Sequence, residues 1–175
     1  HLDPRQGGDP AVVAADGVPV TAVDLELGGT TPVEVTAAAG RAVSGLGAAL
    51  FELAPDLVVL LGDRYEILAA AMAAHLLRLP VAHLSGGDVT EGSLDDAMRH
   101  AVSKLSHLHL PSNAASARRL RALGEPSDRI VTVGSTALDA LATFVPLDRT
   151  GLAVRLGIEP GIAPTSRLIA VAYHA

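Results

Sequence analysis

Short apolar runs alternate along the chain with longer stretches in which apolar residues recur every three or four positions. The short runs are rich in Val and Leu and lie at 19–23, 57–61, 80–84, 107–110, 130–133 and 168–173. The longer stretches lie at 32–53, 65–78, 94–105, 113–123 and 136–144. This spacing predicts strands that are apolar on both faces, separated by helices.

Strands without polar alternation are typical of a parallel sheet buried between layers of helices. We therefore predict an α/β fold, a doubly wound parallel sheet of the Rossmann type. The alternation of predicted strands and helices is interrupted over 145–166, which contains three prolines and three glycines and only a short helical segment around 150–156. We expect residues 1–145 to form one domain, and 146–175 to be a linker and the first strand of a second domain.

The composition excludes several classes of protein. The chain has 175 residues, enough for one core, and with only two Phe, two Tyr and no Trp that core must use Ala, Val and Leu. A formal charge of −6 opposes nonspecific binding to nucleic acid or anionic lipid. The absence of Cys excludes disulfides and thiolate metal sites. We predict a cytoplasmic protein without a nucleic-acid partner.

The sequence contains no segment that predicts membrane insertion or export. The longest apolar stretch, 67–77, is about half the roughly 20 residues that a membrane-spanning helix needs. The opening "HLDPRQGGDP" has no basic region followed by an apolar segment, and it does not begin with Met. We therefore expect no membrane partner, no signal peptide and no natural start at residue 1.

Loops that leave the carboxyl ends of parallel strands line the ligand sites of such sheets. The candidates are "GDR" at 62–64, "SGGDVTEGS" at 85–93, "PSN" at 111–113 and "GST" at 134–136. The first two are the richest in acidic residues and glycine, and if their strands are neighbours, Asp63 shares a crevice with 85–93. An alternative remains open, in which Asp63 only caps the helix that follows it.

The stretch "HLSGGDVTEGSLDDAMRH" at 83–100 combines a polar loop with the start of a helix. Ser93 and Asp96 form a capping-box pattern, and Asp95 and Asp96 suit the positive end of the helix dipole. Asp95 and Arg99 are four residues apart on one helix face, where the arginine could hold the carboxylate ionised or compete with it for a ligand phosphate. The role at the helix start and the interaction of Asp95 with Arg99 both stay open as interpretations.

The same stretch offers groups for catalysis and for close approach of a ligand. Gly86 and Gly87, after Ser85, let backbone approach a ligand, although they match no nucleotide-binding motif. A pair of carboxylates for proton transfer could come from this loop and helix, but spacing does not select which two. The candidates are Asp88, Glu91, Asp95 and Asp96.

The histidines of the strands suggest a metal site only weakly. His107 and His109 share one face of their predicted strand and His83 lies on the strand before, but no further ligand stands at a recognisable spacing. We interpret all three as packed side chains. No metal and no cofactor are predicted.

Three segments together resemble the UDP-N-acetylglucosamine 2-epimerases, and more closely their hydrolysing branch. They are "PDLVVLLGDRYEILAAAMAA" at 55–74, "PVAHLSGGDVTEGSLDDAMRHAVSKLSHLHLPS" at 80–112 and "RIVTVGSTALDAL" at 129–141. The likeness runs from "HLDPRQGG" to "AVAYHA". It implies two Rossmann-like domains in the GT-B arrangement, with a UDP-sugar bound between them.

The resemblance also implies what lies outside residues 1–175. The opening strand of the family would precede His1, and most of the second, nucleotide-binding domain would follow Ala175. We therefore expect this fragment alone to be inactive. The full-length protein is expected to be a homo-oligomer.

Roles for individual residues follow from the resemblance. Asp63 matches the catalytic aspartate, Asp95 the acidic residue that opens the helix, and His174 the histidine of an "HP" motif that reads "HA" here. Ser85 stands where many members carry glutamate, and Asp88 is the candidate that would replace this acid. The substrate-binding residues implied are His1, Arg64, Ser85, Gly86, Gly87, Arg99 and Ser135.

The reaction implied begins with removal of the C2 proton and anti loss of UDP, which gives a 2-acetamidoglucal. Water then adds, and the 2-epimerised free sugar, such as N-acetylmannosamine, is released. This chemistry needs carboxylates for proton transfer and a histidine or arginine at the leaving phosphate.

Three alternatives stay open: a non-hydrolysing epimerase, a GT-B glycosyltransferase that uses a UDP-sugar, and a catalytically silent UDP-sugar-binding domain. The "GGDVTEG" loop resembles the hydrolysing branch and disfavours the first. Ser85 and the "HA" ending are the features that favour the silent domain.

Overall fold

The computed structural model describes residues 10–26, 31–142 and 144–157 and the single residues 167, 169 and 171. The chain divides into two compact units, His1–Thr136 and Ala137–Ala175. The second unit contains α6 (Asp139–Ala142) and α7 (Arg149–Arg155). The first unit contains α1 (Pro10–Ala15), α2 (Pro32–Leu53), β1 (Val58–Leu61), α3 (Tyr65–Leu76), β2 (Val81–Leu84), α4 (Leu94–Leu105), β3 (Leu108–Leu110) and α5 (Ala114–Ala122).

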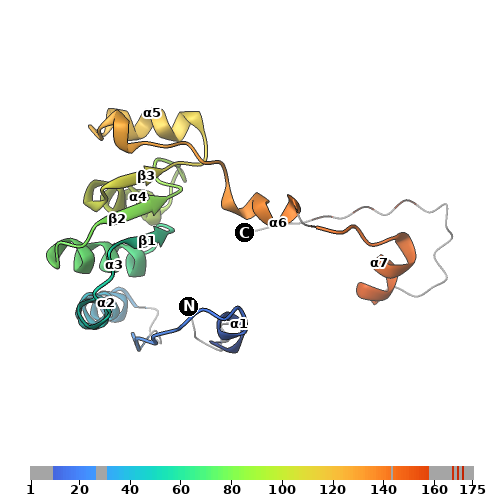
Figure 1. Ribbon diagram of the computed structural model, residues 1–175, viewed down its shortest axis with the longest axis horizontal. Helices are drawn as coiled ribbons and strands as arrows, with labels where there is room; N and C mark the ends of the chain where they lie inside the picture. Colours follow the sequence, from blue (N-terminus) through green and yellow to red (C-terminus); the bar gives the residue numbers. More distant parts are fainter. Residues whose placement is uncertain are drawn as a thin grey trace. The chain divides into compact units, whose positions relative to one another are not determined.

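The three strands form a parallel sheet in the order β1, β2, β3 (Figure 1). In its register Leu60 of β1 pairs with His83 of β2, and His83 pairs with His109 of β3. Helices α3 and α4 connect successive strands, which is the β-α-β arrangement of Rossmann-like sheets. The predicted α/β class with a parallel sheet is confirmed.

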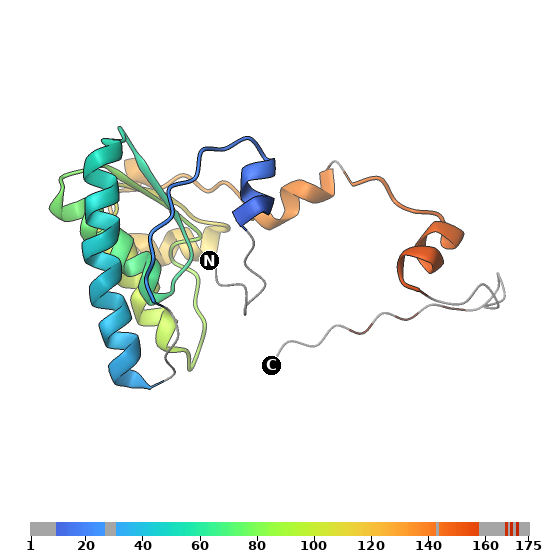
Figure 2. The same ribbon diagram turned by 90° about the horizontal axis from the view of Figure 1, so that it is seen from below.

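The core between helices and sheet is built from small side chains. Ala71 and Ala74 of α3, Val81 of β2 and Val102 of α4 are 0% exposed and pack in one cluster with Leu60. Because alanine adds little bulk, α3 packs closely against α2, α4 and the strands β1 and β2. Figure 2 shows α2 as the outermost of these helices. No helix of the described segments is both long and apolar enough to cross a bilayer.

The start of α2 follows from local sequence. Thr31 caps the helix in a capping box, in which the Glu34 N–H donates to Thr31 Oγ1 (3.3 Å) and the Thr31 N–H donates to Glu34 Oε2 (3.0 Å). Pro32 occupies the first helical position, where its missing N–H costs nothing. The predicted helix at 32–53 is confirmed.

The strand predicted at 19–23 is wrong. This segment forms no sheet pairing and is followed by residues held to α2, where Arg41 Nε donates to the Leu25 carbonyl oxygen (3.2 Å). Val23 lies so close to Gly45 of α2 that a Cβ there would be 2.7 Å from Val23 Cγ1. Packing across a helix has therefore replaced strand pairing. The short helix α1 was not predicted.

The strand predicted at 130–133 is reduced to one bridge. Ile130 pairs in parallel with His109, and the N–H groups of Val131 and Val133 donate to the carbonyl oxygens of His109 (2.9 Å) and Pro111 (3.1 Å). The segment therefore runs beside β3 without forming a regular strand. The strand predicted at 168–173 falls largely outside the described residues, and the domain division at 145/146 stays a prediction.

Candidate active site

Arg99 of α4 gathers polar groups at the carboxyl ends of β1 and β2. Its Nη2 donates to Thr90 Oγ1 (3.0 Å) and forms an ion pair with Asp63. Its Nη1 donates to Asp96 Oδ1 (3.2 Å) and to the Asp88 carbonyl oxygen (3.0 Å). Arg99 is only 7% exposed, so these acceptors replace most of its hydration. We call Arg99, Asp63, Asp88, Thr90 and Asp96 the Arg99 cluster.

The turn after β1 directs Asp63 toward α4. Gly62 has a φ of 116°, which only glycine adopts readily, and the chain leaves the strand there. The capping position of α3 belongs to Arg64, which makes no side-chain capping bond. Asp63 therefore does not cap α3, and it lies beside the loop after β2, since both contact Arg99. The Asp63 side chain is 27% exposed and so remains open to a ligand.

Helix α4 begins at Leu94 as predicted, but the capping box is wrong. Ser93 Oγ accepts from the Asp95 N–H (3.2 Å), whereas the Asp96 carboxylate accepts from the Thr90 N–H (2.9 Å). Asp96 reaches past the cap because Arg99, one turn later, holds the same carboxylate. The Asp96 carboxylate thus joins Thr90 to the first turn of α4.

The pairing of Asp95 with Arg99 is also wrong. The carboxylates that pair with Arg99 are Asp96, three residues before it, and Asp63, from another strand end. The guanidinium faces the loop after β1, where it pairs with Asp63. Asp95 is half-buried in the first turn of α4. Its role in catalysis stays a prediction.

Asp88 connects the loop after β2 to the next strand and helix. Its Oδ1 accepts from the hydroxyls of Ser112 (3.0 Å) and Ser116. Ser112 follows β3, and Ser116 lies in the first turn of α5, which Asn113 caps. The positive end of the helix dipole favours a carboxylate there. Asp88 is therefore held at the same sheet edge as Asp63.

Packing inside the protein requires glycine at both positions after Ser85. A Cβ at Gly86 would lie 2.9 Å from both His83 Nδ1 and Ser103 Oγ, and one at Gly87 would overlap the Ser116 carbonyl. The role of Gly86 and Gly87 in binding a ligand stays a prediction. Ser85 has a φ of 59°, a left-handed conformation that costs an ordinary residue about 1 kcal/mol. Such strain is common at functional sites.

The three histidines predicted to lie in strands have separate partners, and His107 directly precedes β3. His83 lies 3.2 Å from the Gly62 carbonyl oxygen through Nε2, and burial lowers its pKa to about 4. His109 Nε2 lies 3.0 Å from Glu125 Oε2, and burial lowers its pKa also. His107 accepts the Val81 N–H through Nδ1 (3.2 Å). In the described ranges no group of three or more His, Asp or Glu side chains is arranged to hold a metal ion.

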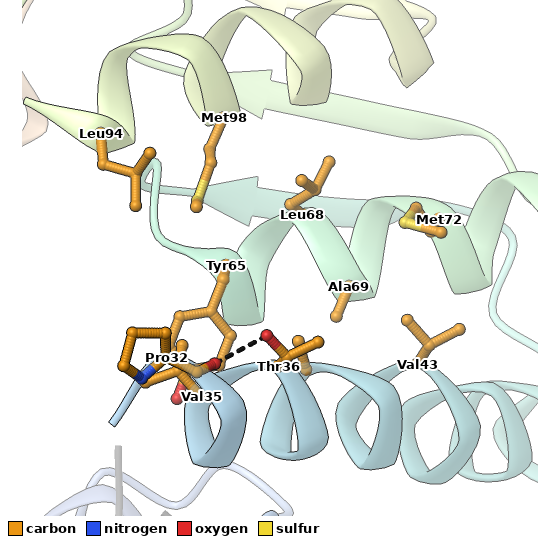
Figure 3. Close-up of a pocket in the computed structure, with 11 residues that line it drawn as sticks. Pro32, Val35, Thr36, Val43, Tyr65, Leu68, Ala69, Met72, Leu94 and Met98 are labelled. Carbon is orange, nitrogen blue, oxygen red and sulfur yellow. Dashed lines mark hydrogen bonds between the residues drawn. The ribbon is translucent and has the colours of Figure 1, made fainter. Parts of the chain in front are cut away.

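An apolar pocket of about 550 Å³ lies between α2, α3 and α4 (Figure 3). Its lining includes Val35, Tyr65, Leu68 and Met98 and has no charged side chain. Burial and the neighbouring Glu66 raise the pKa of Tyr65, so its hydroxyl stays protonated. The pocket offers nothing to neutralise a phosphate, and the charged chemistry belongs to the Arg99 cluster.

Among the remaining predicted site residues that the structure describes, Arg64 and Ser135 make no side-chain bond to this cluster. Arg64 is paired with Glu66 (3.2 Å) and its side chain is 54% exposed. Ser135 is exposed and follows the segment that runs beside β3, and no hydrogen bond joins it to the cluster within the described part of the chain. His1 and His174 lie outside the described residues.

Sequence reasoning missed three hydroxyl residues that hold the site together. They are Thr90, which bonds Arg99 and Asp96, and Ser112 and Ser116, which bond Asp88. The available signal was their position in or just after loops at the carboxyl ends of strands. Hydroxyl side chains there can bond the carboxylates of neighbouring loops.

The family model described as UDP-N-acetylglucosamine 2-epimerase matches residues 6–175. The UDP-N,N'-diacetylbacillosamine 2-epimerase (hydrolyzing) of Legionella pneumophila is 36% identical over 161 residues, which cover 91% of this chain and 42% of that protein. The GDP/UDP-N,N'-diacetylbacillosamine 2-epimerase (hydrolyzing) of Campylobacter jejuni is 36% identical over 137 residues, covering 78% of this chain and 36% of that protein. The chain thus spans less than half the length of these relatives.

The fold is also similar to solved structures. The UDP-GlcNAc 2-epimerase of Neisseria meningitidis, bound to UDP-GlcNAc, superposes with a TM-score of 0.60 at 29% identity. The match covers 65% of this chain and 32% of that chain. This likeness confirms the fold predicted from the sequence, a Rossmann-like part of the GT-B arrangement.

Proposed function

The chain belongs to the UDP-N-acetylglucosamine 2-epimerase family, and from that premise we propose that the full-length protein is a hydrolysing 2-epimerase. It converts a UDP-linked N-acetylhexosamine and water into UDP and the free sugar inverted at C2, such as N-acetylmannosamine. The hydrolysing activity named for the two curated relatives supports this outcome. The observation that carries the proposal is the Arg99 cluster, which places Asp63 and Asp88 at one edge of the sheet.

Asp63 takes part in proton transfer at C2 of the sugar. The C2–H bond breaks, the bond from C1 to the UDP oxygen breaks on the opposite face, and the electrons form the double bond of a 2-acetamidoglucal. Water then adds at C1 while a proton returns to C2 on the other face, which balances the reaction. Asp63 suits this role because its carboxylate is oriented by Arg99 and still partly exposed.

The other site residues support this step. Asp88 is the proposed proton donor in place of the acid that Ser85 cannot supply, held by the hydroxyls of Ser112 and Ser116. Asp95 orients the sugar from the first turn of α4. Arg64, whose side chain is more than half exposed, and His174 stabilise the leaving phosphate. Homo-oligomerisation and a cytoplasmic location stay predictions.

The test is turnover of the full-length protein in D₂O with UDP-N-acetylglucosamine or UDP-N,N'-diacetylbacillosamine and no acceptor. We expect UDP and free sugar in equal amounts, with deuterium at C2. A non-hydrolysing epimerase would exchange C2 but keep the nucleotide sugar. A glycosyltransferase would need an acceptor, and a silent domain would give neither product.

Asp63→Asn provides the matched test of the site. The change keeps the shape of the side chain and removes the base, so UDP release should fall by about 100-fold or more. Asp56→Asn removes an exposed carboxylate just before β1, at the other end of the strand, and should leave turnover unchanged. Equal rates for the two variants would refute the role of Asp63.

A further inference from the structure

His83 of β2 connects the backbones of the two residues that form the ion pair of Asp63 with Arg99. Its Nε2 lies 3.2 Å from the carbonyl oxygen of Gly62, the residue before Asp63. Its Nδ1 lies 3.1 Å from Ser103 Oγ, which in turn lies 3.1 Å from the Arg99 carbonyl oxygen. Together with the ion pair, these contacts connect the loop after β1, strand β2 and helix α4.

The hydrogen-bond partners of His83 decide which nitrogen of its imidazole carries the hydrogen. A carbonyl oxygen only accepts, so Nε2 carries the hydrogen and donates to Gly62, which leaves Nδ1 as an acceptor beside Ser103 Oγ. The Ser103 hydroxyl has one hydrogen, which it donates either to Nδ1 or to the Arg99 carbonyl oxygen at any one time. Burial lowers the pKa of His83 to about 4, so the imidazole is neutral near pH 7. A neutral, fully buried ring does not exchange protons with a substrate, and its contacts act on the backbone of the loop.

Packing leaves the ring no room to change position. His83 is 0% exposed. Gly86 covers its contact with Ser103, since a Cβ at Gly86 would lie 2.9 Å from His83 Nδ1 and 2.9 Å from Ser103 Oγ. The hydrogen bond to Gly62 therefore fixes the peptide group that leads into Asp63, at the point where the chain turns out of β1.

We propose that His83 is a positioning residue, which sets the Asp63 carboxylate against Arg99 for proton transfer at C2. This inference rests on the proposed function. Gly62 permits the turn but, having no side chain, cannot hold it, and the hydrogen bond from Nε2 supplies the constraint. A shift of about 1 Å in a catalytic group can cost about 100-fold in rate.

The experiment compares His83 with His109 in the full-length protein. His109 is the register neighbour of His83 on β3, is also 0% exposed, and bonds Glu125 rather than the loop before Asp63. His83→Leu should lower kcat by about 10- to 100-fold with KM changed by less than about threefold. His109→Leu should lower stability while kcat per folded molecule stays within about twofold of the wild type.

Rescue by a conservative variant separates positioning from packing. His83→Gln can still donate to the Gly62 carbonyl and should recover most of the kcat lost in His83→Leu, although both remove the imidazole. A near-normal kcat in His83→Leu would overturn the proposal. So would an equal loss in His109→Leu, because burial alone would then explain both.

Hydrogen exchange tests the geometry without turnover. Amides of 60–66 and 94–105 should exchange faster in His83→Leu and in Ser103→Ala than in His109→Leu, when each rate is taken relative to other amides of the sheet in the same variant. If the wild-type protein releases no UDP from either sugar, the proposed function fails and this measurement alone decides the inference. Unchanged exchange at 60–66 would overturn it, and if His83→Leu does not fold, Ser103→Ala decides by the same measurements.

Discussion

Replacing Arg99 with Met should destabilise the chain far more than the loss of an exposed ion pair. Met keeps most of the apolar stem of arginine and removes the guanidinium. The change leaves Asp63 and Asp96 without a cation and leaves the Asp88 carbonyl and the Thr90 hydroxyl without a donor.

The magnitude follows from burial. The Arg99 side chain is 9% exposed, whereas those of Asp63 and Asp96 are 27% and 28% exposed. Removing one partner of a buried pair costs about 3–5 kcal/mol, and an exposed pair contributes about 0–1 kcal/mol. Because water reaches the two carboxylates in part, we expect the lower end of the buried range, about 3 kcal/mol.

Arg64→Met is the matched control, since Arg64 pairs with Glu66 while its side chain is 54% exposed. Its cost should stay below about 1 kcal/mol. The double variant Asp63→Asn with Arg99→Met should cost less than the sum of the two single changes, by about 1–3 kcal/mol, because the second change removes an already unpaired charge.

Urea unfolding of the chain, followed by far-ultraviolet circular dichroism, measures these differences. Circular dichroism suits the chain because it has no Trp to report by fluorescence. The m-values must agree among variants for the midpoints to compare stability. If Arg99→Met costs no more than Arg64→Met, Arg99 does not organise the loops as we describe.

Three further predictions follow from the same geometry. The free energy of unfolding measured in urea should fall as pH is lowered from 6.5 toward 4, and His83 should account for up to roughly 3 kcal/mol of this fall. His83→Leu should remove that part of the pH dependence. The reason is that the unfolded chain binds a proton at His83 in this window and the folded chain does not. Gly87→Ala should cost about 2–4 kcal/mol through overlap with the Ser116 carbonyl and a φ of 81°, whereas Gly92→Ala, with a φ of 79° and open space around it, should cost about 1 kcal/mol. Equal costs in the same urea assay would contradict the overlap. In the full-length protein Asp88→Asn should lower UDP release by about 100-fold and Ser85→Ala by less than about tenfold, and the reverse order would point to the serine as a group that positions water.

The sequence by itself determined the elements and the edge of the sheet at which the site lies. The helices at 32–53 and 94–105 and the three paired strands were predicted to within a residue or two, because periodicity reports which faces of an element are buried. The proximity of Asp63 to the loop at 85–93 followed too, since parallel strands present their carboxyl ends at one edge.

Only the tertiary structure decided which side chains meet. Local spacing favoured Asp95 as the partner of Arg99, but the guanidinium instead bonds Asp63, 36 residues away, and pairs with Asp96 within the helix. Likewise the segment 19–23 packs on α2 instead of joining the sheet, and Gly86 makes room for a buried histidine. Helix and strand signals arise from neighbours along the chain, whereas these contacts depend on how separate elements approach each other, which no local pattern records.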